Sequence, residues 1–317
     1  MFIDRLITNI KKHNNPTVVG LDPKLEFIPA KIRERSFAEH GSSAAGVSDA
    51  ILRFNTKLID AVYDIVPAIK PQLAYYEMYG AEGIQAFART CAYARSKGML
   101  VIADGKRNDI GTTAQAYADA YLGKVPTGDL KESMFDIDAL TVNPYLGFDG
   151  IKPFTEACAE YDKGIFVLVK TSNKSSGQLQ DLVTQDGKHI YKKVAELVDE
   201  WGTPLIGENG YSSVGAVVGA TWPEQAKVLR HIMKKAYILV PGYGAQGGTA
   251  EDAVISFNSD GLGAIINASR SILCAWKSEK WSDKYTEDEF DSAAREEAIR
   301  MRNDINEALE RRQHAKT

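Results

Sequence analysis

The feature that most constrains this chain is a regular alternation of short apolar runs with longer segments of helical period. The eight apolar runs have the length of buried strands. They are Thr17–Leu21, Val66–Lys70, Met99–Ala103, Asp138–Val142, Gly164–Val169, Val214–Gly219, Tyr237–Val240 and Gly263–Ile266. The helical segments between them are Ser48–Ile65, Gly80–Lys97, Thr112–Tyr121, Phe148–Glu160, Ile190–Glu200, Trp222–Met233 and Thr249–Asn258. Strand followed by helix, repeated, predicts a parallel sheet with helical connections.

Eight such units predict an α/β fold of one closed (β/α)8 barrel, the TIM barrel, for which about 250 residues are typical. The competing architecture is a doubly wound open sheet, which often begins with a GxGxxG turn after its first strand. Here the first strand leads into Gly20-Leu21-Asp22-Pro23 instead. No linker or shift in composition divides the 317 residues, so residues 1–317 are expected to form a single domain.

The residues in excess of a minimal barrel fall in four places. Lys24–Val47 is a polar insertion after the first strand, and Thr171–His189 is a long polar loop after the fifth. Lys124–Phe135 is expected to add a helix before the fourth strand. Tyr285–Thr317 opens with a capping-box sequence and continues with apolar residues on one face, which predicts a C-terminal helix packed on the barrel.

Charge and composition exclude several classes of protein. The chain has 38 basic and 42 acidic side chains, a net charge of −4, so no basic excess indicates nucleic acid and an anionic ligand needs a local site. Met1–Lys12 has apolar residues at helical spacing, which predicts an amphipathic cap and neither a signal peptide nor a membrane span. Three scattered cysteines, Cys91, Cys158 and Cys274, predict neither disulfides nor a metal site and favour the reducing cytoplasm.

Candidate catalytic residues follow the predicted strands, because barrel enzymes carry their chemistry at the carboxyl ends of the strands. The charged and hydroxyl residues found there are Asp22, Lys70, Asp104, Lys106, Lys170, Thr171, Ser172 and Arg270. Successive strand residues point to alternate faces, so Asp104 and Lys106 are expected on the same side, around one ligand. Asp109 lies beyond the strand, in the turn before the next helix.

A glycine-rich segment, Pro241–Gly248, follows the seventh predicted strand and has four glycines in eight residues. Such a loop allows backbone N–H groups to approach an anion, and barrels frequently bind phosphate between the seventh and eighth loops. Arg270, after the eighth strand, adds a donor suited to phosphate. The two together predict a phosphate site.

These motifs, in this order, resemble the orotidine 5′-phosphate decarboxylase family, and specifically its longer bacterial-type subfamily. The resemblance covers most of the chain. Its carriers are Val19–Pro23, Ile69–Gln72, Tyr75–Glu77, Asp104–Ile110, Thr141–Gly147, Lys170–Asn173, Val218–Thr221, Pro241–Gly248 and Ser269–Ser271. Thr141–Gly147 and Val218–Thr221 suit barrel packing and loop shaping as well as ligand contact.

The resemblance implies a role for each matching residue. Phosphate is expected on Gln246, Gly247, Gly248 and Arg270, ribose hydroxyls on Asp22 and Lys70, and the pyrimidine edge on Ser172. Asp104 and Lys106 match the central residues of the DxKxxD motif, and Asp109 matches its last residue. In the family that last Asp reaches the neighbouring subunit's site together with a nearby Thr, here Thr113. A homodimer with shared sites follows.

The motif departs from the family pattern at two uncharged positions. Gly105 stands where alanine is common, and Asn108 where glycine is common. Gly105 is expected to loosen the end of the third strand. Asn108 is acceptable in a turn because asparagine tolerates positive φ better than most residues.

The implied reaction is decarboxylation of orotidine 5′-monophosphate, a nucleotide, to uridine 5′-monophosphate in pyrimidine biosynthesis. The chain shows no metal, thiamine or pyridoxal signature, so no cofactor is expected and electrostatics must stabilise the carbanion at C6. Lys106 is expected to stabilise that charge and donate the proton, with Asp104 orienting it. Closure of Thr171–His189 and Pro241–Gly248 over the ring is expected to exclude water.

Three alternative functions fit the sequence less well. A sugar-phosphate decarboxylase or synthase on the same barrel would need Mg²⁺ and a carboxylate near the second strand, which instead ends in Lys70. An inactive nucleotide-phosphate binding protein would be expected to lack Lys106 or Asp104. A Schiff-base aldolase using Lys170 requires a lysine with a lowered pKa, and the neighbouring Ser172 and the DxKxxD motif favour the decarboxylase over it.

Overall fold

Eight parallel strands close into a barrel in the computed structural model, which describes residues 1–244 and 247–314. The strands are β1 (Thr17–Leu21), β2 (Ala68–Pro71), β3 (Leu100–Arg107), β6 (Ala139–Val142), β7 (Gly164–Lys170), β8 (Ser212–Val218), β9 (Ala236–Val240) and β10 (Ala264–Ala268). Their order around the barrel follows the chain, and β1 closes it by pairing with β10. Each predicted apolar run is one of these strands, so the (β/α)8 barrel is confirmed.

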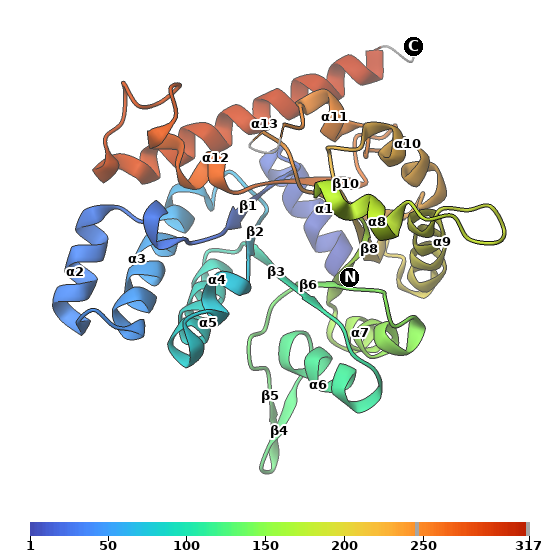
Figure 1. The fold of residues 1–317 in the computed structure, drawn as a ribbon, viewed down its shortest axis with the longest axis horizontal. Helices are drawn as coiled ribbons and strands as arrows, with labels where there is room; N and C mark the ends of the chain where they lie inside the picture. The colour runs from blue at the N-terminus through green and yellow to red at the C-terminus, as the bar shows by residue number, and fades with distance from the viewer. Residues whose placement is uncertain (245–246, 315–317) are drawn as a thin grey trace.

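Helices surround the strands, as the spacing predicted (Figure 1). The connecting helices are α3 (Ala44–Val62), α5 (Gly80–Ser96), α6 (Gly111–Tyr121), α7 (Phe148–Tyr161), α9 (Ile190–Gly202), α10 (Pro223–Ile232) and α11 (Ala250–Val254). Shorter helical pieces are α4 (Ala74–Glu77), α8 (Gly177–Gln180), α12 (Arg270–Leu273), η1 (Leu25–Phe27), η2 (Lys174–Ser176), η3 (Thr203–Leu205) and η4 (Ala275–Lys277). The strands are almost wholly buried because the helices cover their outer face.

The amino-terminal cap is confirmed as α1 (Phe2–His13), which lies behind the strands in Figure 1. Its apolar face, including Leu6 and Ile7, is buried against residues of the barrel interior. Phe2 packs edge-on against Phe166 of β7, with ring centroids 6.4 Å apart. The helix therefore closes one end of the barrel, and the mouth for a ligand is at the other.

The insertion after β1 contains η1 and a helix, α2 (Ala30–His40), which packs against the start of α3. The predicted terminal helix is α13 (Phe290–His314), preceded by the short turn η5 (Glu287–Glu289). The expected capping box between Thr286 and Glu289 is present. Helix α13 runs along the upper edge of the barrel in Figure 1 and packs against α3, α11 and α12, with Phe290 stacked on Phe54 at 5.1 Å.

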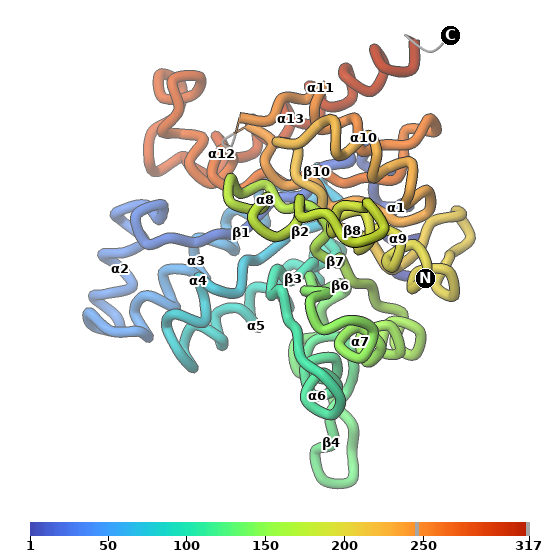
Figure 2. The backbone as a smooth tube through the Cα atoms, turned by 45° about the vertical axis from the view of Figure 1, so that its right-hand side comes forward, coloured from blue at the N-terminus to red at the C-terminus, as the bar shows by residue number. Residues whose placement is uncertain are grey.

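The prediction of a helix at Lys124–Phe135 is wrong. This segment forms an antiparallel hairpin of β4 (Val125–Thr127) and β5 (Leu130–Glu132), which projects beyond α6 in Figure 2. Pro126 disfavours a helix interior, and Gly128 adopts a left-handed φ of 70° in the two-residue connection.

None of the helices in residues 1–244 and 247–314 combines the length and the apolar character that a membrane span requires.

Candidate active site

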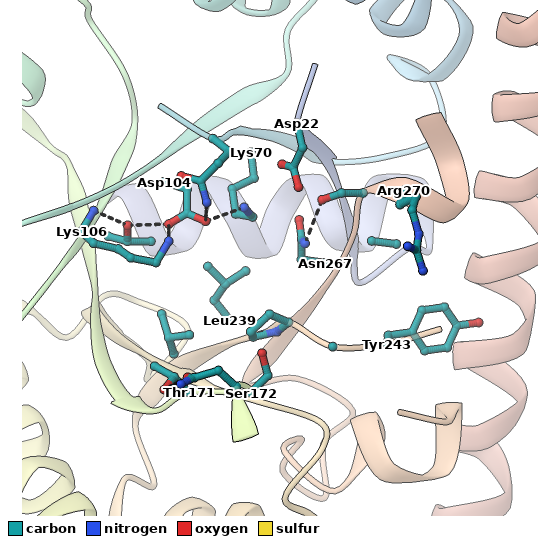
Figure 3. Close-up of a pocket in the computed structure, with 18 of the residues that line it drawn as sticks. Asp22, Lys70, Asp104, Lys106, Thr171, Ser172, Leu239, Tyr243, Asn267 and Arg270 are labelled. Carbon is teal, nitrogen blue, oxygen red and sulfur yellow. Dashed lines mark hydrogen bonds and ion pairs between the residues drawn. The ribbon is translucent and has the colours of Figure 1, made fainter. Parts of the chain in front are cut away.

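A cavity of about 560 Å³ opens at the carboxyl ends of the strands, a size that suits a small organic ligand. Its lining includes the predicted residues Asp22, Lys70, Asp104, Lys106, Ser172 and Arg270. Figure 3 shows Lys106 and Arg270 at opposite ends of the cavity, with Ser172 across from Asp22. Leu168, Val217 and Leu239 provide apolar surface.

Asp104, in the second half of β3, is the centre of the polar network. Its Oδ2 accepts hydrogen bonds from Lys70 Nζ at 2.7 Å and from Gln72 Nε2 at 3.1 Å. Its Oδ1 accepts from Lys106 Nζ at 2.6 Å and from Thr141 Oγ1 at 2.9 Å. Four donors on three strands and the segment after β2 thus hold one buried carboxylate in place.

The two lysines and the aspartate stabilise one another's charges. Burial alone would raise the pKa of Asp104, but the ammonium groups of Lys70 and Lys106 hold that pKa well below its usual range. Burial alone would lower the pKa of Lys70, but the carboxylates of Asp104 and Asp22 raise it. Asp104 therefore remains an anion, and Lys70 a cation, throughout the neutral range.

Asp104 and Lys106 meet as predicted, but simple strand alternation is not the reason. The pairing of β3 with β6 shifts register between Ala103 and Arg107, so this stretch bulges. Lys106 has a left-handed φ of 48°, and its backbone N–H donates to Thr141 Oγ1 at 2.9 Å. A backbone with this φ is strained at a residue other than glycine, and such strained residues cluster at functional sites.

The structure shows the surroundings of the two departures from the family motif. Asn108 is not among the described residues with positive φ; within this turn Lys106 adopts that conformation. Gly105 packs closely, since a Cβ there would come within 2.7 Å of Leu73 Cδ1 and 3.3 Å of Leu140 Cδ1. Glycine therefore permits close packing of β3 at this position.

Asp22 and Asn267 carry unused hydrogen-bonding capacity beside the cavity. Each has a buried Oδ1 that accepts no hydrogen bond from any described residue. Buried polar atoms are rarely left without a partner, so these two oxygens indicate where a ligand's hydroxyl or N–H groups bind.

The glycine-rich segment begins at the cavity wall with Pro241, Gly242 and Tyr243. In this structure the predicted phosphate donors bond within the loop, Gly247 N to Gly244 O at 2.8 Å and Gly248 N to Gly242 O at 3.1 Å. Gln246, a further predicted phosphate ligand, lies outside the described residues. Of the predicted phosphate ligands in the described part of the chain, Arg270 lines the cavity directly.

Asp109 and Thr113 do not line this cavity. Asp109 is half-buried in the turn after β3, where its Oδ1 accepts from the backbone N–H of Ile110 at 2.8 Å, and Thr113 is exposed on α6. One chain by itself therefore does not bring these two predicted residues to its own site.

Sequence reasoning missed three polar residues of the cavity. Gln72 and Thr141 donate to Asp104, and Asn267 lies beside Asp22 (Figure 3). Their positions at the ends of β2, β6 and β10 were the available signal. Thr141 belongs to the motif Thr141–Gly147, whose sequence suits barrel packing as well as ligand contact.

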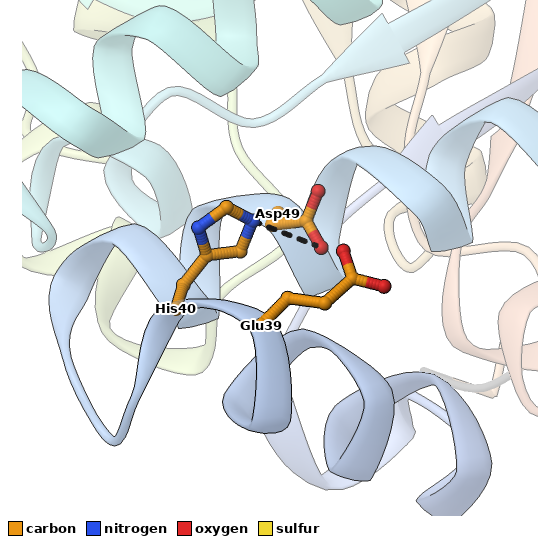
Figure 4. Close-up of side chains that lie close together, drawn as sticks. All are labelled: Glu39, His40 and Asp49. Carbon is orange, nitrogen blue, oxygen red and sulfur yellow. Dashed lines mark ion pairs between the residues drawn. The ribbon is translucent and has the colours of Figure 1, made fainter.

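A group of three potential metal ligands in the described part of the chain lies away from the cavity. Glu39, His40 and Asp49 approach one another between α2 and α3 (Figure 4). Arg53 donates to both carboxylates, to Glu39 Oε2 at 2.5 Å and to Asp49 Oδ2 at 2.6 Å. The arginine already supplies the positive charge that a cation would bring.

Lys170, the residue considered for a Schiff base, is fully buried and does not line the cavity. Its Nζ donates to Asp181 Oδ1 at 2.7 Å. An ammonium held in this way is not placed to attack a substrate carbonyl, which argues against the aldolase.

Comparison with known proteins identifies the family of this chain. Residues 18–285 match the model of the orotidine 5′-phosphate decarboxylase / HUMPS family. Orotidine 5′-phosphate decarboxylase of Rhodopirellula baltica is 45% identical over 300 residues, which are 95% of this chain and 97% of that protein. The enzyme of that name from Caldicellulosiruptor saccharolyticus is 45% identical over 282 residues, 89% of this chain and 92% of that protein.

A solved structure supports the same assignment. The structure of Leishmania donovani OMP decarboxylase superimposes with a TM-score of 0.72 at 29% identity, covering 97% of this chain and 98% of that one. The match therefore extends over the barrel and over the helices added to it. With its closed barrel and its network of Lys70, Asp104 and Lys106, the chain belongs to the orotidine 5′-phosphate decarboxylase / HUMPS family.

Proposed function

We propose that this protein converts orotidine 5′-monophosphate to uridine 5′-monophosphate and CO₂. The observation that carries the proposal is the buried Asp104, held between Lys70 and Lys106 in the cavity at the barrel mouth. A carbanion at C6 of the pyrimidine has no good delocalisation, so the enzyme must supply positive charge at a fixed place.

The layout of the cavity supports one orientation of the nucleotide. Arg270 at one end would bind the phosphate, together with the glycine-rich segment, and Lys106 at the other end would face C6. Asp22 and Lys70, between them, would bind the ribose hydroxyls, and the unpaired Oδ1 of Asp22 provides an acceptor for one. Ser172, on the opposite wall, would contact the pyrimidine edge.

In the proposed reaction the bond between C6 and the carboxylate breaks heterolytically, which leaves the electron pair on C6 and releases CO₂. The Lys106 ammonium stabilises that pair and then donates a proton to C6, and the resulting amine regains its proton from water. Asp104 orients Lys106 through the 2.6 Å ion pair. Its negative charge would lie close to the substrate carboxylate, so it would also disfavour the ground state.

Two copies of the chain would complete two sites. Asp109 and Thr113 lie outside their own cavity. Ile110, next to Asp109 in the chain, is 54% exposed, and Tyr145, after β6, is 74% exposed. An exposed apolar surface of this kind is typical of a protein interface. We therefore propose a homodimer in which Asp109 and Thr113 reach the partner's site.

We also propose that residues 1–317 form one domain located in the cytoplasm. The segments outside the family match, α1 and α13, pack onto the barrel and share its apolar core. Cys91, Cys158 and Cys274 are free thiols, which suits a reducing compartment.

The test is the loss of orotidine 5′-monophosphate absorbance in the presence of EDTA, with uridine 5′-monophosphate identified as the product. We expect turnover that EDTA does not change. Turnover that EDTA abolishes and Mg²⁺ restores would contradict the metal-free mechanism, and absence of turnover in the wild type would contradict the proposal.

A further inference from the structure

Lys170, the last residue of β7, is a buried charge for which the proposed reaction has no use. Its side chain is 0% exposed. Its Nζ donates to Asp181 Oδ1 at 2.7 Å and to Ser176 Oγ at 3.3 Å, and lies 4.9 Å from the ring centroid of Trp222. Burying an ammonium is costly unless it is paired, so these contacts are strongly favoured. They tie the end of β7 to the segment that contains α8.

The next residue, Thr171, is held by the same segment. Its backbone N–H donates to Gln180 Oε1 at 3.0 Å, and Gln180 Nε2 donates back to Thr171 Oγ1 at 2.8 Å. On the other side, Trp222 Nε1 donates to the carbonyl oxygen of Thr171 at 2.9 Å. The backbone and side chain of Thr171 are thus restrained from two directions.

Ser172, which follows, is the residue proposed to read the pyrimidine. Thr221 Oγ1 donates to its carbonyl oxygen at 3.2 Å. Gly219 lies directly against it, since a Cβ at Gly219 would be 2.9 Å from Ser172 Cα. The loop after β8 therefore packs against the backbone of Ser172. The restraints on Thr171 fix the direction in which the backbone enters Ser172.

Polar contacts, and not apolar burial, hold α8 in place. Leu179 is 47% exposed, and Leu182 and Val183 after the helix are also exposed. A segment with little buried apolar surface opens easily unless specific bonds restrain it. The contacts of Gln180 and Asp181 supply such bonds.

We infer that Lys170, Gln180 and Asp181 are positioning residues that hold Thr171 and Ser172 in place for recognition of the pyrimidine ring. The inference rests on the proposed function, because it takes Ser172 as the contact to that ring. The restraint on Thr171 and Ser172 affects recognition of the base and not of the sugar phosphate. Loss of the restraint weakens binding of a nucleotide and leaves binding of a ribose phosphate without a base unchanged.

The experiment measures the dissociation constants of uridine 5′-monophosphate and ribose 5-phosphate by calorimetry for Asp181→Asn and Gln180→Ala. We expect the constant for the nucleotide to rise by about tenfold and that for the sugar phosphate to stay within about twofold. Asp181→Asn leaves an unpaired buried ammonium, which can impair folding. Gln180→Ala leaves the Lys170 ion pair intact, so it tests the inference on a folded protein.

A double-mutant cycle with Ser172→Ala separates positioning from general destabilisation. If Gln180 acts through Ser172, the double variant binds the nucleotide about as weakly as the weaker single variant. Asp186→Asn is the matched control, because Asp186 is in the same segment but pairs with Lys193 at 2.7 Å. It is expected to bind both ligands as the wild type does.

Two results would overturn the inference: an unchanged preference for nucleotide over sugar phosphate in Gln180→Ala, or effects of Gln180→Ala and Ser172→Ala that simply add. Neither measurement requires turnover. A wild type that binds uridine 5′-monophosphate but leaves orotidine 5′-monophosphate intact would contradict the proposed function alone. A wild type that binds no nucleotide would contradict both.

Discussion

Asp104 shows how one side chain organises a reactive centre. An isolated buried carboxylate is strongly unfavourable, and here Lys70, Gln72, Lys106 and Thr141 compensate it. The same contacts place the Lys106 ammonium, because the bulge in β3 turns its backbone to a left-handed φ. Burial of the anion and orientation of the cation are therefore parts of one arrangement.

Lys106→Ala is expected to lower kcat by at least about a thousandfold, because it removes both the charge at C6 and the proton donor. Binding of uridine 5′-monophosphate, which lacks the departing carboxylate, is expected to change much less. Steady-state kinetics and calorimetry check the two parts. Lys152→Ala, at an exposed lysine of α7, is the control. A Lys106→Ala enzyme with near-normal kcat would refute the assigned role.

Asp104→Asn is expected to lower the free energy of unfolding by about 3 kcal/mol at pH 7, since it leaves the Lys70 charge buried without its partner. The native pKa of Asp104 lies below its usual value, so its stabilisation is complete above the unfolded pKa of about 3.9. It is lost progressively as pH falls from there toward the native pKa. Urea unfolding of the wild type and of Asp104→Asn from pH 7 to pH 3 measures the difference between their free energies of unfolding. This difference should stay constant at first and shrink below about pH 4. A difference that grows toward acid pH would contradict the prediction.

Among the secondary-structure elements, the helices added to the barrel lie at different places relative to its mouth. Helix α1 closes the opposite end, and the insertion with α2 lies beside α3. Helix α13 crosses α3, α11 and α12, and its Asp304 accepts a hydrogen bond from Tyr243 of the glycine-rich segment. The C-terminal helix thus contacts a wall of the cavity.

Leu6→Ala is expected to destabilise the protein by about 2–5 kcal/mol, because Leu6 of α1 is fully buried against the barrel interior and its truncation leaves a cavity. Thr8→Ala, on the exposed face of the same helix, should change stability by less than about 0.5 kcal/mol. Urea unfolding midpoints measure both. Equal effects of the two substitutions would show that α1 does not act as a packed cap.

For the whole molecule, sites shared between two subunits imply that mixing two inactive variants restores a defined share of the activity. Lys106→Ala and Asp109→Ala proteins are each expected to be nearly inactive. Random mixing of their subunits puts one intact site in each mixed dimer, so about a quarter of wild-type activity should return. Mixing Lys106→Ala with Asp104→Ala is the control, because these two residues share one chain's site and no activity should return. No recovery in the first mixture would contradict sharing across subunits.

The barrel itself was predictable from the chain. Apolar runs such as Thr17–Leu21 and Gly164–Val169 are buried on both faces, and this leaves a pattern visible in the composition of each run. The hairpin at Lys124–Phe135 was not predicted, because most of its residues are exposed and so lack the alternation of apolar and polar residues that marks a half-buried strand. The charged residues at strand ends were likewise identified, since the barrel places all strand ends at one mouth.

Periodicity and residue type are local properties, so the eight strands, the amphipathic ends and the charged groups at the mouth could be predicted from the chain alone. Which atoms meet became clear from the three-dimensional structure. It showed Thr141 and Gln72 on Asp104, the left-handed Lys106, and Lys170 turned away from the cavity to Asp181. These depend on register, bulges and burial between segments far apart in the chain, which no local pattern records.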